Sequence, residues 1–139
     1  MTSSNLDNLV KIGNLKKEDM TPTEFVGFLR SGNARLTDAK NLQLSFESRF
    51  DLAYNAAHVL SLAALRWHGY RSENRYLVFQ VLPDTLRLGP EVWRVLAKCH
   101  EHRNLAEYEG HLEIDEQLLR DLLVATDVVL AKLILLDKS

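Results

Sequence analysis

A column of polar side chains marks the second half of a helix that the sequence predicts to begin at Pro90. His100, Asn104 and Tyr108 follow one another at steps of four, so they share one helix face, and Arg103 lies one position round the helix. The column continues an apolar stripe and therefore lies at the rim of the core or lines a cleft. Desolvated arginine, histidine and tyrosine need partners, and in a cleft a ligand can be one of them.

A purely structural explanation of the same residues stays open. Arg103 can pair with Glu107, four residues further on, while the other polar side chains cover the end of a helical bundle. The spacing alone does not distinguish a binding site from this arrangement.

A second candidate is a short segment in which arginines are interleaved with aromatic residues. Its members are Arg66, Trp67, Tyr70, Arg71, Arg75 and Tyr76. Guanidinium groups bind phosphate in a forked geometry and aromatic faces stack on bases, so the segment suits RNA or a nucleotide. The alternative is that the cations favour a helix C-terminus through its dipole while the aromatic residues pack in the core.

The sequence predicts no metal site and no cofactor. Cys99 and His102 share a helix face, but His100 points away from His102, and two ligands do not make a zinc site. Cys99 is the single cysteine, so no intramolecular disulfide can form, and a reducing compartment fits.

Length and composition predict one domain without a membrane segment. The chain has 139 residues and a net charge of −2, which gives no general attraction to nucleic acid or to an anionic membrane. Residues 1–20 read as a polar arm, in which Leu6, Leu9, Val10 and Ile12 form either one or two helical turns or a mobile segment, and residues 21–139 read as one helical-bundle domain. The apolar stretch Val128–Leu136 is too short to span a bilayer and is interrupted by Lys132, and the N-terminus does not resemble a signal peptide, so we expect a cytoplasmic protein.

The first long helices have clear start signals. Thr21, Pro22 and Glu24 form a capping sequence, and Gly32 falls on the apolar stripe that follows, where it either admits a close neighbour or breaks the helix. Ser45 is predicted to cap a second long helix that stops near Gly69. Its inward stripe comprises Phe50, Ala53, Tyr54, Ala57, Leu60, Ser61, Ala64, Leu65 and His68.

The second half of the chain is also predicted to be helical. Ser72 is expected to cap a short helix ending at Pro83, and Gly110 to end the helix that begins at Pro90. Asp115 is expected to cap a last helix. We find no period-two alternation and no hairpin turn, so the sequence predicts an all-α, up-and-down bundle of four to five helices.

Two segments resemble the HEPN superfamily of small helical domains. Residues 53–60, which read Ala-Tyr-Asn-Ala-Ala-His-Val-Leu, followed by Gly69-Tyr70-Arg71, are similar to the central helix and turn of that family. Residues 103–108, which read Arg-Asn-Leu-Ala-Glu-Tyr, resemble the motif in which an arginine and a polar residue precede a histidine. The likeness covers roughly residues 22–135 at the level of helix order.

The resemblance implies a bundle that dimerises with the arginine motif at the dimer cleft. Active members cleave RNA without a metal, whereas others bind RNA or nucleotides, or pair with a minimal nucleotidyltransferase in toxin–antitoxin systems. Here Tyr108 stands where the family has histidine, and His111 follows beyond the expected helix end. A tyrosine with a pKa near ~10 is a poor general base at neutral pH, so the resemblance favours a binding module with a degenerate motif.

Three functions therefore stay open at this point. The first is RNA or nucleotide binding through Arg103, Asn104, Tyr108 and His100, with Arg66, Arg71 and Arg75 as a second basic set. The second is a metal-independent endoribonuclease in which Arg103 stabilises the reacting phosphate and His111 or His100 moves protons. The third is a protein-interaction module that uses the acid-rich segment 107–127 to bind a basic partner.

Overall fold

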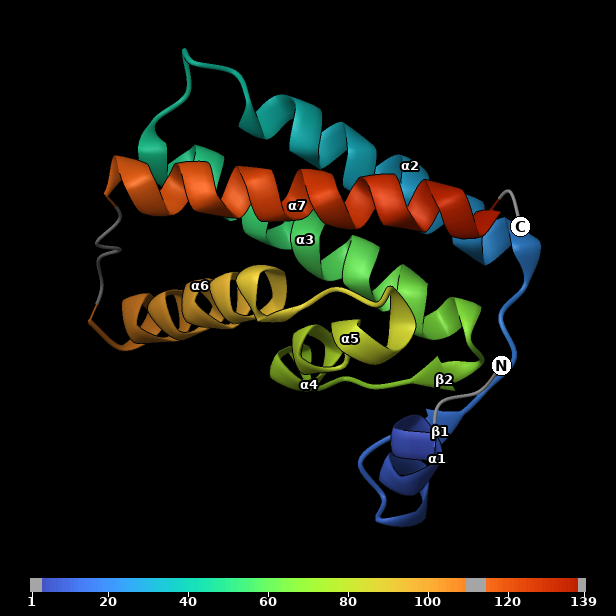
Figure 1. Cartoon of the computed structure of the whole chain (residues 1–139). Helices are drawn as coiled ribbons and strands as arrows, with labels where there is room; N and C mark the ends of the chain where they lie inside the picture. The colour runs from blue at the N-terminus through green and yellow to red at the C-terminus, as the bar shows by residue number, and fades with distance from the viewer. Residues whose placement is uncertain (1–3, 110–114, 138–139) are drawn as a thin grey trace.

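Four long helices form the body of the protein. The computed structural model describes residues 4–109 and 115–137, with side chains described for 4–105 and 115–136. The long helices are α2 (Pro22–Ala39), α3 (Phe46–Trp67), α6 (Pro90–Glu109) and α7 (Glu116–Asp137). Helix α3 runs through the centre; α2 and α7 pack along it, and α6 packs mainly against α7 and α4 (Figure 1). The prediction of an all-α helical bundle is confirmed.

Shorter elements join and flank these helices. They are α1 (Ser4–Lys11), β1 (Lys16–Lys17), β2 (Tyr70–Arg71), α4 (Arg75–Gln80) and α5 (Leu82–Thr85). The two strands pair antiparallel, with Lys16 opposite Arg71 and Lys17 opposite Tyr70. Strands of two residues are too short to show an alternating pattern, which is why the sequence predicts none. None of the helices within the described ranges is both long and apolar enough to cross a lipid bilayer.

Of the two alternatives for the N-terminal leucines, helical turns are observed in α1, and this segment packs against the body. Leu6 and Leu15 are buried in a second apolar cluster with Leu65, Tyr70 and Val78. The Tyr70 hydroxyl donates a hydrogen bond of 2.5 Å to Asp7 on α1. Burial followed by this bond raises the pKa of Tyr70 to about 12. A few leucines at helical spacing are thus enough to attach a segment whose composition is otherwise polar.

The predicted helix starts are largely confirmed. The side chain of Thr21 accepts a hydrogen bond of 3.2 Å from the backbone N–H of Glu24, and that of Ser45 accepts one of 3.1 Å from the N–H of Ser48. Asp115 accepts in the same way from the N–H of Leu118 at 2.7 Å. Gly69 follows the end of α3 with φ of 86°, a conformation that glycine adopts without strain.

Two predicted boundaries are wrong. Helix α4 is capped by Asn74, whose side chain accepts from the N–H of Leu77, whereas Ser72 accepts from the N–H of Asn74 and shapes the preceding turn. Pro83 does not end this helix, because α4 already ends at Gln80. It lies instead in the first turn of α5, where a missing N–H costs nothing. The predicted helix end at Gly110 lies outside the described residues.

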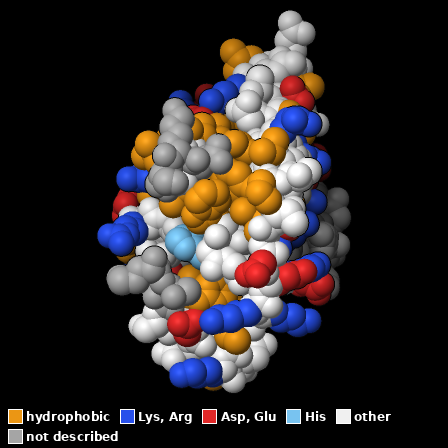
Figure 2. Space-filling model, turned by 90° about the vertical axis from the view of Figure 1, so that its right-hand side faces the viewer, with side chains coloured by type: hydrophobic (Ala, Val, Ile, Leu, Met, Phe, Trp, Pro, Cys, Tyr) orange, Lys and Arg blue, Asp and Glu red, His pale blue; other side chains and the backbone are white. Residues whose placement is uncertain are grey.

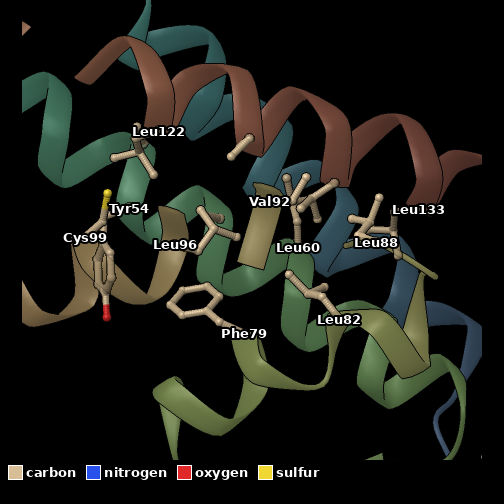
Figure 3. Close-up of a cluster of buried hydrophobic side chains, with 14 of the residues drawn as sticks. Tyr54, Leu60, Phe79, Leu82, Leu88, Val92, Leu96, Cys99, Leu122 and Leu133 are labelled. Carbon is tan, nitrogen blue, oxygen red and sulfur yellow. The ribbon is translucent and has the colours of Figure 1, made fainter. Parts of the chain in front are cut away.

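The core is built around α3, which is buried on most of its circumference. Figure 3 shows side chains from α3, α4, α5, α6 and α7 converging there, among them Leu60, Phe79, Leu96 and Leu122. The alanines of α3 allow close helix approach. Helix α2 continues unbroken through Gly32, where an added Cβ would overlap the side chain of Leu60. Of the two roles predicted for Gly32, close packing is therefore the one observed.

Candidate functional site

Tyr54 on α3 links the core to the polar column of α6. Its side chain is buried, and its hydroxyl lies 2.7 Å from Nδ1 of His100. In Figure 3 this hydroxyl points away from α7 and out of the apolar cluster. The two rings are nearly parallel, with centroids 6.2 Å apart. The core of the bundle thereby fixes the position of an imidazole at its edge.

Asn104 holds the other side of the same imidazole. Its side-chain nitrogen lies 3.1 Å from Nε2 of His100, one helical turn away. Both ring nitrogens therefore have hydrogen-bonding neighbours. A histidine held at both nitrogens is well oriented for binding, but it must break a bond before it can carry a proton to or from a substrate.

Arg103 lies beside this pair, and its partner is an acid on another helix. Its guanidinium forms an ion pair with Asp51 on α3, and its Cζ lies 5.6 Å from the centre of the Tyr54 ring. The side chains of Arg103 and Asp51 are 29% and 46% exposed, so the pair is open to solvent. An ion pair at such a position contributes little to stability, and a competing anion can displace the carboxylate.

Arg75 at the start of α4 completes the cluster from a third helix. Its Cζ lies 5.7 Å from the centre of the Tyr54 ring, and its guanidinium lies 3.5 Å from the side-chain oxygen of Asn55. Within the described ranges no carboxylate lies at ion-pair distance from Arg75. Tyr76 follows it and packs its ring edge-on to His100, with centroids 6.1 Å apart. Two guanidinium groups, an imidazole and a half-buried phenol ring thus gather around Tyr54.

His58 lies one turn further along α3 and is held neutral. Burial, and then the charges of Arg75 and His100, lower the pKa of His58 to about 4. Its ring meets Phe79 edge-on, with centroids 6.3 Å apart. His58 is therefore partly buried and uncharged at neutral pH.

The three arginines of the basic, aromatic segment differ in their burial and in their partners. Arg66 is 4% exposed and binds Glu24 through two hydrogen bonds of 2.9 and 3.1 Å, and it also donates to the backbone carbonyls of Glu18 and Asp19. These bonds hold the pKa of Glu24 below its ordinary value. Arg66 therefore fastens the segment before α2 to α3, and its position gives no support to a role in binding phosphate.

Arg71 and Arg75 remain accessible. Arg71 is half exposed and pairs with Glu18 at 3.1 Å, so the expected patch is divided between a buried anchor and two surface cations. Tyr108, His111 and the side chain of Glu107 lie outside the described residues and side chains, and the prediction of an ion pair between Arg103 and Glu107 stays a prediction.

Three residues of the cluster escaped the sequence interpretation. They are Asp51, Tyr54 and Asn55 on α3. Tyr54 was expected only as a core residue, and it is buried, but its hydroxyl also binds His100. A sequence signal does exist, because Tyr54 and Asn55 interrupt a run of small apolar residues with two polar groups. It shows that polar groups are present, but it cannot show that they meet α6.

Comparison of the chain with protein-family models, with curated proteins and with solved structures gives no match.

Metal and cysteine chemistry receive no support from the described part of the chain. Within residues 4–105 and 115–136 there is no group of three or more histidine, cysteine, aspartate or glutamate side chains that could hold a metal ion. Cys99 is fully buried, and burial raises the pKa of its thiol to about 12, which keeps it protonated and unreactive at neutral pH.

A cavity at another place on the molecule lacks the combination of cations and aromatic rings found around Tyr54. It has a volume of about 730 Å³ and lies where α2 begins and α3 ends, lined by Met20, Phe25, Val26, Trp67 and His68 among others. Figure 2 shows hydrophobic side chains gathered on this side of the molecule. His68 there is bonded to the carbonyl oxygen of Thr85 at 2.8 Å. The cluster around Tyr54, in contrast, combines cations, aromatic rings and hydrogen-bonding groups suited to a phosphate-bearing ligand.

Proposed function

We propose that this protein is a HEPN-like module that binds RNA or a nucleotide, with a phosphate of the ligand on Arg75 and Arg103. The observation that carries the proposal is the convergence of these two guanidinium groups on the Tyr54 ring from separate helices. Guanidinium groups from different elements can grip one phosphate from two directions. The resemblance of residues 53–60 and 103–108 to HEPN segments supports the same ligand class.

The neighbouring groups suit the remainder of a nucleotide. Asn104 is exposed and its side-chain oxygen can accept a hydrogen bond from a sugar or base, and Tyr76 is half-buried with an aromatic face that can stack. Tyr54 is a positioning residue, because it is buried and acts through His100. Since both nitrogens of His100 are engaged and Tyr108 replaces the histidine of the family motif, we propose binding without cleavage. We expect RNA to stay intact after long incubation with the pure protein in a chelator.

The ion pair between Arg103 and Asp51 provides a test with two opposite outcomes. A phosphate must compete with Asp51 for the guanidinium. Arg103→Ala should therefore weaken binding of a single-stranded RNA decamer, whereas Asp51→Asn should strengthen it. Arg94→Ala, which removes an exposed arginine from the first half of the same helix, is the matched control and should bind as the wild type does.

The measurement is fluorescence anisotropy of labelled RNA over a series of salt concentrations. Each phosphate contact to a single strand contributes about 0.7 to the slope of log affinity against log salt, so Arg103→Ala should reduce the slope by about that amount. If Arg103→Ala and the wild type bind equally at every salt concentration, the proposed site is wrong.

We also propose that the module forms a homodimer and acts beside a minimal nucleotidyltransferase, as a toxin–antitoxin component. The partner is proposed from the resemblance. The dimer is also proposed from the resemblance, and we place Leu105, which is 54% exposed directly after Arg103 and Asn104, in its interface. Light scattering should give the mass of a dimer for the wild type and of a monomer for Leu105→Lys. A monomeric wild type would contradict the dimer and leave the binding site to be judged separately.

A further inference from the structure

A second cavity adjoins the cluster around Tyr54. It has a volume of about 340 Å³ and lies between α2, α3 and the segment that leads from β2 into α4. Its walls include Phe28, His58, Leu62, Arg71, Glu73 and Arg75. The volume is near the lower end of the range of about 300–1,000 Å³ for small-molecule sites, so it suits one compact group.

We propose that this cavity is a second subsite of the same ligand and holds a nucleobase with an exocyclic amino group, next to the phosphate on Arg75. The inference rests on the proposed function and extends it to the kind of base that is bound. Adenine, cytosine and guanine carry such an amino group, and uracil does not.

Arg75 makes the cavity continuous with the first site. It lies over the ring of Tyr54 and also forms part of the cavity wall. Tyr54 and His58 are four residues apart on α3, which corresponds to about 6 Å along the helix axis. Neighbouring parts of one nucleotide chain can therefore reach both places while a single guanidinium contacts the phosphate between them.

The chemistry of the walls favours a base over a second phosphate. Glu73 is exposed, lines the cavity and, like Arg75, forms no ion pair with any residue in the described ranges. Its carboxylate repels phosphate but accepts hydrogen bonds from an amino group. His58 is neutral and adds a donor and an acceptor, while Phe28 and Leu62 supply apolar contact. Glu24 and Arg66 also line the cavity but bind each other, and Arg71 is paired with Glu18. Glu73 is thus left as the wall carboxylate without an ion pair in the described ranges, and together with a neutral imidazole and apolar side chains it matches a base edge and its ring faces.

The test compares two RNA hexamers that differ only in their base, oligocytidylate and oligouridylate. Cytosine presents an amino group where uracil presents a carbonyl oxygen, so the contact with Glu73 is gained in one case and becomes repulsive in the other. We expect the wild type to bind oligocytidylate about tenfold more tightly at neutral pH. In Glu73→Ala the preference should fall below about threefold, through weaker binding of oligocytidylate, and binding of oligouridylate should not weaken.

Two controls separate this inference from the proposed function. Glu47→Ala removes an exposed acid from the first turn of α3 and should retain the full preference. Arg103→Ala should weaken both hexamers by the same factor. Equal binding of the two hexamers by the wild type, or an unchanged preference in Glu73→Ala, would overturn the second subsite and leave the first intact. If neither hexamer binds the wild type, both the proposed function and this inference are wrong.

Discussion

The two glycines inside α2 should respond to the same substitution in different ways. Gly27 is exposed, and a Cβ built there has no neighbour within 4 Å. At Gly32 the added Cβ would lie 2.5 Å from Cγ of Leu60, a side chain that is fully buried. Both positions lie within one continuous helix, so the intrinsic benefit of alanine over glycine is similar at each.

The expected changes in the free energy of unfolding follow from the surroundings of the two glycines. In a helix interior alanine is more stable than glycine by about 0.5–1 kcal/mol, and Gly27→Ala should raise the free energy of unfolding by that amount. At Gly32 the same gain is opposed by overpacking, which typically costs about 1–3 kcal/mol when the core cannot yield. Gly32→Ala should therefore leave the protein less stable than Gly27→Ala by about 1–3 kcal/mol.

Urea unfolding followed by circular dichroism measures both variants. A double-mutant cycle with Leu60→Ala identifies the cause, because in that background the space beside Gly32 is empty and Gly32→Ala should become stabilising. The reasoning fails if Gly32→Ala stabilises the wild type as much as Gly27→Ala does, or if its effect is the same with and without the Leu60 side chain.

Three further predictions concern the buried polar groups. Glu24→Ala should lower the free energy of unfolding in urea by about 3 kcal/mol, because it leaves the buried cation of Arg66 without its carboxylate, and a loss below about 1 kcal/mol would contradict this. Acidification from pH 6.5 towards 4 should destabilise the wild type by up to about 3 kcal/mol through His58, because the unfolded chain binds a proton that the native ring with a pKa of about 4 does not. His58→Gln should remove this part of the pH dependence, and an unchanged curve would show that the ring is not the cause. Tyr70→Phe should cost about 1–2 kcal/mol and speed amide hydrogen exchange in α1, and unchanged exchange there would show that the bond to Asp7 does not secure this helix.

The features that the sequence predicts well depend on neighbours in the chain. The capping roles of Thr21, Ser45 and Asp115 each involve a residue three positions away, so the signal lies within a single turn. The inward stripe of α3 is equally readable, because periodicity alone defines it. The start of α4 shows the limit of such reasoning. Ser72 and Asn74 are both able to cap a helix and lie two positions apart, and Asn74 is the cap because of the way the chain leaves β2.

The candidate site was only partly predictable, because its contacts join residues far apart in the chain. Tyr54 and His100 are 46 residues apart, and Arg66 and Glu24 are 42 apart. Spacing on α6 correctly groups His100 with Asn104, which are bonded, but it cannot show that Asp51 on another helix is within reach of Arg103. For the same reason Arg66 resembles a phosphate-binding residue in the sequence although the fold uses it as a buried anchor.

The carboxylate partners of the arginines decide which of them can bind an anion. Arg66 is itself buried and binds the carboxylate of Glu24 through two hydrogen bonds, so displacing that carboxylate would leave a buried cation unpaired. Arg71 and Arg103 each have a solvent-exposed partner, which a phosphate can replace at little cost in free energy. Arg75 forms no ion pair within the described ranges, so a phosphate that binds it has no carboxylate from those ranges to displace. The order in which these arginines can accept an anion is therefore Arg75, then Arg71 and Arg103, then Arg66. Arg75 and Arg103, to which we assign the phosphate, are both ahead of Arg66.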